Sequence, residues 1–376
     1  MRVLMATERF LPELGGVEVF TARLAAALIE RGHEVALVTS RSGLTEYEED
    51  RLGAMPVYRL PFESSLRARD YARVIALRQR LAALKRTLRP DVVHLNTSGA
   101  SLLFHLLTRR AATAPTVLTV HWLPNRERLA VVCGQALAAA DWVVGVTRGC
   151  LDEACALDST IASRSSVIYN SLPPVALAPT PLAFDPPRLL CLGRLEAQKG
   201  FDVALRALAA VRRYLPAVRL TVSGDGTQRS ALEDLAAQLG LAAAVRFTGW
   251  VAPDDVPRLI NEHTLVVMPS RYEPFGLVAL QAAQMCRPLV ASRIAGLSEV
   301  VRDGETGVLC DANDPTAFAA AIIALFRQEA VAIRMGTRAR EHVQRAFCWD
   351  EQVSAYEALF HRIHAETRGS RVSGSS

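Results

Sequence analysis

The stretch TLVVMPSRYEPFGLVALQ, residues 264–281, decides the fold of the second half of the chain. Its first five residues are an apolar run typical of a strand covered on both faces, and the residues after Gly276 begin a helix. The carboxylate of Glu273 therefore stands just before a helix N-terminus, where the first N–H groups are unpaired and the helix dipole is positive. Such an end binds phosphate, and a carboxylate accepts hydrogen bonds from hydroxyls. The stretch thus predicts a site for a nucleotide-sugar.

The same stretch resembles the signature of the retaining family 4 glycosyltransferases (glycosyl transferases group 1), which has a Glu, seven residues and a second Glu. Glu273 holds the first position and Gln281 holds the second. The resemblance extends from Gly15 to about Phe360 and is strongest over residues 189–309. It implies an α/β GT-B fold, in which two doubly wound Rossmann-like domains enclose an interdomain cleft. It also implies retaining transfer of a hexose-type sugar from a nucleoside diphosphate-sugar, with a UDP-sugar as the expected donor, to an acceptor hydroxyl.

The order of apolar runs along the chain supports this architecture independently. Short β-branched runs alternate with helical segments in both halves, beginning with Val3–Ala6 in the first and Leu189–Leu192 in the second. Continuous apolar strands between helices indicate parallel sheets with helices on both faces. Six prolines among the sixteen residues 172–187 separate the two halves and predict a semi-rigid linker.

Five segments follow from this order and from the resemblance. We expect an N-terminal Rossmann-like acceptor domain, a Pro-rich linker, a C-terminal nucleotide-sugar donor domain, a helix that crosses back to the first domain, and a disordered tail. Their predicted limits are residues 1–175, 176–187, 188–348, 349–366 and 367–376. The tail is polar and rich in Gly and Ser, which is typical of a chain end without fixed structure.

Composition and charge limit the partners and the compartment. The net charge of +5 suits an anionic substrate or membrane surface, but the basic residues are not interleaved with stacking aromatics, so no nucleic-acid partner is expected. The longest apolar stretch, residues 129–146, is interrupted by Gln135 and Asp141 and predicts a core helix followed by a strand. Seven cysteines without a Cys-x-x-Cys pair, and a first segment with a strand pattern, favour a cytoplasmic protein.

Two cations flank a tight loop after the strand 189–192. Arg194 and Lys199 lie in the segment GRLEAQKG, residues 193–200, and would neutralise a diphosphate at a strand end. The alternative is a solvated loop that carries two cations by chance. The resemblance favours diphosphate binding, because the family has an Arg and a Lys at this spacing. It assigns Gly193, Arg194 and Lys199 to the donor and both cations to catalysis.

Two further candidates lie in the first half of the chain. Gly15 and Gly16 precede the first helix, and the resemblance places them against the donor diphosphate and the acceptor. A simple strand-to-helix turn is the alternative, and the Gly-x-Gly-x-x-Gly spacing of dinucleotide-binding proteins is absent. His121 ends the strand 116–120, where it would bond a sugar hydroxyl or the acceptor, whereas a lone His is more often structural. The resemblance includes His121 among the catalytic residues.

The resemblance makes Glu273 the main catalytic residue. It implies that this carboxylate contacts hydroxyls of the donor sugar and stabilises positive charge at the anomeric carbon. An ordinary carboxylate at a helix N-terminus, without a ligand, is the alternative. The backbone N–H groups that would hold the sugar and the distal phosphate belong to Phe275, Gly276, Leu277 and Val278.

Gln281 stands where the family has a Glu that holds both ribose hydroxyls. A neutral amide makes weaker hydrogen bonds than a carboxylate, so we expect weakened ribose binding or a site rearranged around the amide. The resemblance also implies that Gly249, Trp250 and Val251 form the loop beside the nucleobase. No Asp-x-Asp pair follows a strand in the predicted site segments, so no metal and no cofactor other than the nucleotide-sugar is expected.

Residues 66–89 form a basic amphipathic pattern. Val74, Leu77, Leu81 and Leu84 recur at helical spacing, and eight basic residues stand against the single acid Asp70. Such a helix can lie on an anionic membrane surface, which would place the protein at the inner face of the membrane. The alternative is a surface helix that packs its apolar stripe on the N-terminal sheet.

Three other functions remain open on the sequence alone. A sugar phosphorylase of the same fold would use inorganic phosphate, and a nucleotide-sugar epimerase would need no acceptor. Gln281 motivates the third, a catalytically degenerate nucleotide-binding or partner subunit. The acceptor hydroxyl itself has no recognisable signature, and the segments expected to meet it are residues 41–50 and 125–129.

Overall fold

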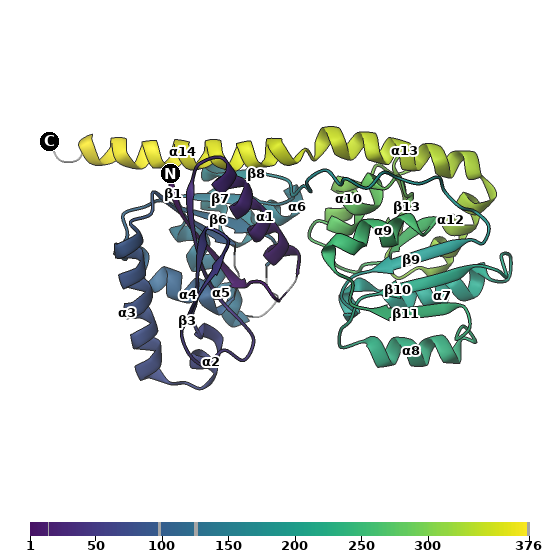
Figure 1. The fold of residues 1–376 in the computed structure, drawn as a ribbon, viewed down its shortest axis with the longest axis horizontal. Coiled ribbons are helices and arrows are strands. Elements are labelled where there is room, and N and C mark those ends of the chain that lie inside the picture. The colour runs from purple at the N-terminus through teal and green to yellow at the C-terminus, as the bar shows by residue number, and fades with distance from the viewer. Residues whose placement is uncertain (14, 97–98, 124–126, 374–376) are drawn as a thin grey trace. The chain divides into compact units, whose positions relative to one another are not determined.

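The computed structural model describes residues 1–13, 15–96, 99–123 and 127–373. They form two compact units, each an α/β fold around its own sheet (Figure 1). The first unit contains Met1–Asn170 and Asp350–Ser376, and the second contains Ser171–Trp349.

In the described part of the first unit, the sheet has eight strands in the order β3-β4-β2-β1-β5-β6-β7-β8. Every neighbouring pair is parallel except β3 and β4, which form an antiparallel edge. The strands are β1 (Arg2–Arg9), β2 (Glu34–Ser40), β3 (Glu48–Leu52), β4 (Met55–Arg59), β5 (Val92–Asn96), β6 (Thr116–Val120), β7 (Trp142–Gly145) and β8 (Ser165–Val167). Central strands such as β5 are buried along their whole length, which explains their continuous apolar sequence.

The described residues of this unit form seven α-helices. They are α1 (Gly16–Glu30), α2 (Phe62–Arg67), α3 (Tyr71–Leu88), α4 (Ala100–Leu107), α5 (Glu127–Ala139), α6 (Arg148–Leu157) and α14 (Trp349–Ser373). The apolar stretch over residues 129–146 is a helix followed by a strand, α5 and β7, as its interruptions predicted. Helix α6 begins where the hydroxyl of Thr147 accepts a hydrogen bond from the N–H of Cys150 at 3.0 Å.

The basic segment 66–89 is divided between two helices. Arg69 adopts φ 53° between α2 and α3, and the side chain of Asp70 then caps α3 by accepting from the N–H of Arg73 at 3.0 Å. Leu77 and Leu81 are buried, and α3 contacts α2 and α4. Part of the apolar stripe of α3 therefore packs on neighbouring helices, while its exposed side carries basic residues together with Tyr71 and Ile75.

Helix α14 lies with the first unit from Asp350 onward. Tyr356 and Phe360 are fully buried there, and the Tyr356 hydroxyl is 3.3 Å from that of Thr119 in β6. The helix continues through Ser373, so the tail expected to be disordered from residue 367 is helical up to that point. Thr367 donates its hydroxyl to the carbonyl of Ile363 at 2.8 Å, which satisfies this polar side chain within the helix. Residues 374–376 lie outside the described part of the chain.

The sheet of the second unit has six parallel strands in the order β11-β10-β9-β12-β13-β14. They are β9 (Arg188–Leu192), β10 (Arg219–Ser223), β11 (Val245–Gly249), β12 (Leu265–Met268), β13 (Leu289–Ser292) and β14 (Gly307–Cys310). The helices are α7 (Phe201–Val211), α8 (Arg229–Gln238), α9 (Val256–Asn261), α10 (Leu277–Gln284), α11 (Ala295–Val300), α12 (Pro315–Arg327) and α13 (Glu329–Ala346). The strand order reverses between β9 and β12, and ligands of such sheets bind beyond the carboxyl ends of the strands at that point.

The proline-rich segment is attached to the second unit. Residues 171–187 contain neither helix nor strand. The buried guanidinium of Arg287 donates to the carbonyl and the hydroxyl of Thr180, both at 2.8 Å, and to the carbonyl of Asn261 at 2.6 Å. The boundary between the units therefore falls at residues 170–171, before the linker predicted over 176–187.

Within the described residues, no single helix combines the length and apolarity needed to cross a membrane. One bent pair, Pro315–Arg327 with Glu329–Gly369, passes this test only when its two members are taken together across a bend of 103°. The apolar side chains of α12 are buried within the protein, since Phe318, Ile322 and Leu325 belong to the core of the second unit.

Candidate active site

The predicted donor residues of the second unit gather at one edge of its sheet. Arg194 follows β9, Trp250 follows β11, and Glu273 lies in the loop between β12 and α10. Because all six strands are parallel, their carboxyl ends meet at the same edge. β9 and β12 are direct neighbours on either side of the point where the strand order reverses. The loop after β9, residues 193–200 (the cation loop), therefore lies beside the loop after β12, residues 269–276 (the Glu273 loop).

An ion pair joins these two loops. The ammonium of Lys199 lies 2.5 Å from Oε2 of Glu273, and the two side chains are only 19% and 11% exposed. Gly200 has φ 64°, and a Cβ there would overlap the carbonyl oxygen of Pro269, so only glycine allows the loops to approach this closely. Arg194, by contrast, is exposed and has no ion-pair partner among the residues that the structure describes. The guanidinium of Arg194 is therefore available to bind an anionic ligand.

Arg271 and Asp202 hold the same loops together and were not predicted. The guanidinium of Arg271 makes two hydrogen bonds of 2.8 Å to the carboxylate of Asp202 in the first turn of α7. It also donates to the carbonyl of Ala197 at 2.8 Å and to Oδ1 of Asn313 at 2.6 Å. The hydrogen bonds from Arg271 lower the pKa of Asp202, and those to Asp202 raise the pKa of Arg271. The sequence did offer one signal for this pair, because Asp202 is an acidic residue in the first turn of the helix that follows the cation loop.

The N-terminus of α10 presents main-chain groups. Gly276 precedes the helix, and the N–H groups of Leu277 and Val278 fall in its first turn, where no earlier carbonyl of the helix can pair with them. The ring of Phe275 is buried and packs edge-on against Phe347 at 5.8 Å between centroids. The side chain of Phe275 is thus part of the core, and only its backbone can serve a ligand.

Close packing fixes the loop that carries Glu273. A Cβ at Gly296, in the first turn of α11, would overlap the carbonyl oxygen of Glu273. Gln281 lies in the second turn of α10 and is half-buried. The structure thus places Gln281 on the same helix whose N-terminus is the predicted phosphate site.

The predicted nucleobase loop has an exposed aromatic side chain. Gly249 ends β11, and its carbonyl accepts a hydrogen bond from the N–H of Gly224 at 2.7 Å. The side chain of Trp250 is 60% exposed, whereas Val251 is partly buried. An exposed indole at the ligand-binding edge of a sheet offers a stacking surface to a planar base.

The remaining predicted residues lie in the first unit. Gly15 caps α1 and Gly16 is its first residue. A Cβ at Gly15 would overlap the carboxylate of Glu18 in the first turn. The neighbouring Leu14 lies outside the described residues.

His121 follows β6 and is buried. Burial lowers the pKa of its imidazole to about 3, so the ring is neutral near pH 7. Its Nε2 is 3.3 Å from Oδ1 of Asn96, and the ring of Phe20 packs edge-on against it at 4.9 Å. Because the amide oxygen can only accept, Nε2 carries the proton, and Nδ1 is left as an acceptor.

A chain of polar side chains continues from His121 into the core. The amide nitrogen of Asn96 is 3.4 Å from Nδ1 of His94, and Nε2 of His94 is 2.8 Å from the hydroxyl of Thr119. The Thr119 hydroxyl in turn meets that of Tyr356 in α14. Burial, together with the nearby His121, lowers the pKa of His94 to about 3. His94 and Asn96 were not predicted as functional, although Asn96 ends the buried strand β5 and His94 lies two residues before it.

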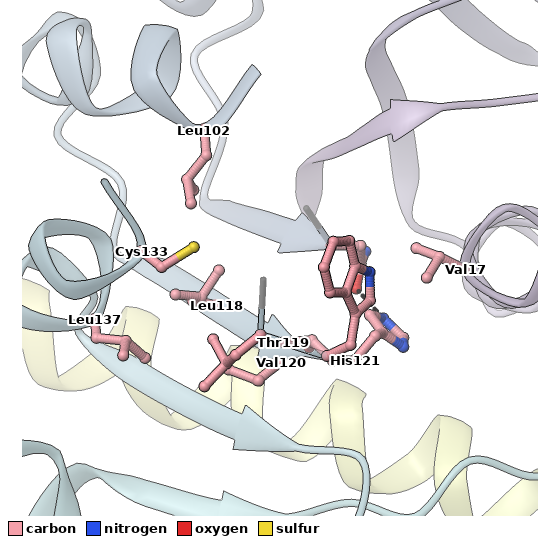
Figure 2. A pocket seen from close by; sticks show the side chains of 11 residues that line it. Val17, Leu102, Leu118, Thr119, Val120, His121, Cys133 and Leu137 are labelled. Atoms are coloured by element: carbon pink, nitrogen blue, oxygen red, sulfur yellow. Dashed lines mark hydrogen bonds between the residues drawn. The ribbon is translucent and has the colours of Figure 1, made fainter. Parts of the chain in front are cut away.

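A pocket that is partly open to solvent lies beside His121 (Figure 2). It is mostly apolar, and its polar lining comes from Asn96, Thr119 and His121. Trp122 is 42% exposed at its rim. Of the two segments expected to meet the acceptor, the first is a loop over residues 41–47 followed by the first part of β3. In the second, residues 125–126 lie outside the described part and 127–129 begin α5.

The two halves of the chain match two family descriptions. Residues 14–174 match Glycosyltransferase Family 4, and residues 178–342 match Glycosyl transferases group 1. The chain is 30% identical to a glycogen synthase of Mycobacterium tuberculosis (strain ATCC 25618 / H37Rv) over 96% of its own length and 94% of the relative. It is also 30% identical to a D-inositol 3-phosphate glycosyltransferase of Acidothermus cellulolyticus, over 95% of this chain and 87% of the relative.

Two solved structures share the fold. A sucrose-phosphate synthase from Thermosynechococcus elongatus superimposes with a TM-score of 0.82 at 22% identity, covering 97% of this chain and 99% of that one. Anabaena HepE, solved in complex with UDP and glucose, gives a TM-score of 0.79 at 20% identity, covering 95% and 98%. At these identities the likeness concerns the fold alone.

Proposed function

The chain is a group 1, family 4 glycosyltransferase with the GT-B fold, and on this premise we propose that it transfers a hexose-type sugar from a UDP-sugar to an acceptor hydroxyl with retention of configuration. One observation carries the proposal: the Lys199–Glu273 ion pair at the ligand-binding edge of the second sheet. A carboxylate for sugar hydroxyls and a cation for phosphate lie there side by side, next to a helix N-terminus.

In this proposal the diphosphate binds between Arg194, Lys199 and the N-terminus of α10. The exposed ring of Trp250 stacks on the uracil, and Glu273 accepts hydrogen bonds from the sugar. As the bond from the anomeric carbon to the phosphate oxygen breaks, negative charge grows on the diphosphate and positive charge on the sugar. Fixed donors and a fixed carboxylate stabilise both charges.

The acceptor lies in the pocket beside His121. Nδ1 of the neutral ring accepts a hydrogen bond from a hydroxyl and orients it. With a pKa of about 3, His121 is too weak a base to hold the proton at pH 7. The acceptor oxygen attacks the anomeric carbon on the face that the phosphate leaves, and its proton passes to the departing phosphate oxygen. No protein base is then needed, which suits a retaining reaction.

Three finer statements belong to the same proposal. Transfer is independent of a metal, because cations and helix N–H groups take the charge of the diphosphate. Gln281 weakens the hold on the ribose without abolishing it. The enzyme works in a reducing compartment such as the cytoplasm, since none of the seven cysteines, all within the described residues, forms a disulfide.

Contact with an anionic membrane through residues 66–89 is a further part of the proposal. Tyr71 and Ile75 are 74% and 54% exposed on α3, and Arg78 and Arg86 are exposed on the same helix. Exposed apolar and basic side chains together suit the headgroup region. Charge reversal at Arg78 and Arg86 should release the protein from anionic vesicles, and unchanged binding would remove this part of the proposal.

The proposed reaction is tested by supplying UDP-glucose with a panel of hydroxyl acceptors and following both UDP release and the anomeric proton of the product by NMR. An α-linked product from the α-linked donor supports retention. Phosphorolysis of a glycoside by inorganic phosphate would instead indicate a phosphorylase, and an altered sugar without acceptor would indicate an epimerase. A folded protein that binds no nucleotide would favour a partner subunit.

A further inference from the structure

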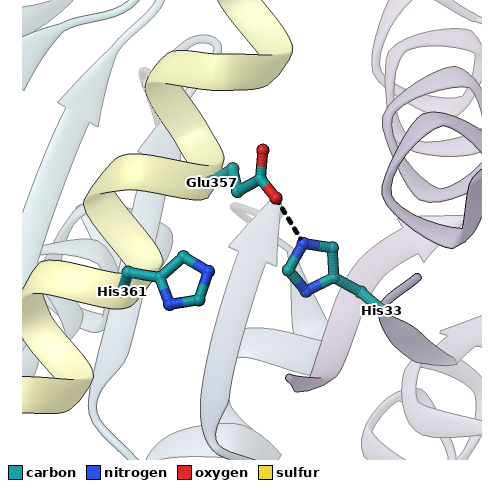
Figure 3. Close-up of side chains that lie close together, drawn as sticks. All are labelled: His33, Glu357 and His361. Carbon is teal, nitrogen blue, oxygen red and sulfur yellow. Dashed lines mark hydrogen bonds and ion pairs between the residues drawn. The ribbon is translucent and has the colours of Figure 1, made fainter. Parts of the chain in front are cut away.

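Two histidines and a glutamate converge where α14 packs on the first unit (Figure 3). His33 lies in the turn between α1 and β2, while Glu357 and His361 stand one turn apart on α14. Nε2 of His33 is 2.8 Å from Oε1 of Glu357, and the two imidazole centroids are 5.9 Å apart. Within the described ranges this is the one cluster of three metal-ligand side chains whose donor atoms all lie within 4.8 Å of one another.

The donor set and its geometry suit a small divalent metal. Two imidazole nitrogens and one carboxylate oxygen are ligands that zinc accepts, with a water in the fourth position. Tetrahedral ligands at zinc distances are about 3.4 Å apart. The observed separations need only a small closing movement, and His361 is exposed and free to make it, whereas the side chain of His33 is only 6% exposed.

Neighbouring charges decide how tightly such a metal is held. Nη1 of Arg31 lies 2.9 Å from Oε2 of Glu357 and also donates to Ser354, so it fixes the carboxylate with Oε1 toward His33. The amino group of Met1 is 3.2 Å from Nδ1 of His33. Both groups orient the ligands, and the positive charge of Arg31 opposes a cation. The expected affinity is therefore moderate.

We propose that His33, Glu357 and His361 bind one Zn²⁺ that fastens α14 to the α1–β2 turn. The site is structural. It includes no residue assigned to sugar transfer and does not depend on the proposed reaction. On binding, the metal takes the place of the proton on Nε2 of His33. The amino group of Met1, 3.2 Å from Nδ1, passes a proton to Nδ1, so the ring stays neutral and one proton is released overall.

The test uses the full-length protein without a polyhistidine tag. Calorimetric titration with Zn²⁺ should give one site per chain, and saturation should raise the melting temperature by about 2–5 °C. Co²⁺ should give the visible absorption of a tetrahedral site that Zn²⁺ then abolishes. His361→Gln and Glu357→Gln should weaken binding by more than about 100-fold, since even groups that only support a ligand contribute 10–100-fold.

The matched control is His364→Gln, because His364 lies on the same helix but bonds the carbonyl of Asp91 instead. It should bind Zn²⁺ like the wild type. No binding by the wild type, or full binding by His361→Gln, would overturn the proposal. His361 is exposed, so its replacement keeps the test valid even if Glu357→Gln fails to fold after Arg31 loses its partner.

Discussion

Replacement of Lys199 by Met would remove the cation that meets Glu273 while keeping the length of the side chain. In the free enzyme this takes away the partner of a carboxylate that is only 11% exposed. In the donor complex it also removes a positive charge from the proposed diphosphate site. The change should therefore affect both stability and catalysis, and the two effects can be measured separately.

The size of each effect follows from the geometry. Ion pairs on the surface contribute about 0–1 kcal/mol, and loss of one partner of a buried pair costs about 3–5 kcal/mol. The two side chains are 19% and 11% exposed, which lies between these cases. We expect the free energy of unfolding to fall by about 1–3 kcal/mol. In other enzymes, removal of one fixed hydrogen-bond donor to developing charge lowers kcat by about 100- to 1000-fold. We expect kcat of the Lys199→Met enzyme to fall by a similar factor.

Rates of UDP release measure catalysis, and urea unfolding measures stability, with Lys199→Arg as the charge-retaining control. Chemical modification adds an independent test, because Lys199 and the buried Lys85 are the only lysines in the sequence. UDP should slow acetylation of Lys199 and leave Lys85 unaffected. A Lys199→Met enzyme with a rate within about threefold of the wild type would refute the assigned role, since threefold is less than 1 kcal/mol of barrier.

Gln281→Glu should lower the donor KM without raising kcat much, since a carboxylate binds ribose hydroxyls more strongly than an amide, and an unchanged KM would contradict the ribose contact. Trp250→Ala should raise the Kd for UDP by about 5- to 150-fold in calorimetry, because base–aromatic stacking contributes about 1–3 kcal/mol, and an equal Kd would argue against stacking. Gly296→Ala should reduce kcat by at least about tenfold by displacing the backbone of Glu273, and a crystal structure with the loop unmoved would count against this. His121 has a folded pKa of about 3 and an ordinary unfolded value near 6.5, so its contribution to stability should be complete above about pH 6.5 and be lost as the pH falls toward 3. The melting temperature of a His121→Phe protein should accordingly depend less on pH across that window than that of the wild type.

The local sequence was sufficient to predict those parts of the site that a single continuous segment forms. The run 264–281 folds as a strand, a loop and a helix because its apolar residues, Gly276 and helix formers follow one another without interruption. The alternation of such segments likewise predicted two parallel sheets. Both patterns depend on neighbours in the chain, which the sequence displays directly.

Contacts between distant segments could not be predicted in the same way. Lys199 and Glu273 were each identified, but their ion pair joins residues 74 positions apart. The bidentate pair of Arg271 and Asp202 spans 69 positions. The boundary at residue 170 also depends on a distant contact, because the buried Arg287 ties the proline-rich segment to the second unit.

Calorimetric titration of the protein with UDP, GDP and ADP, repeated on Lys199→Met, measures the proposed donor site itself. UDP should bind most tightly of the three, and the loss of Lys199 should weaken its binding by at least about tenfold, or 1.4 kcal/mol, as the proposed UDP site requires. Absence of binding by any nucleotide to the folded wild type would contradict it, and so would UDP binding that does not change when Lys199 is removed.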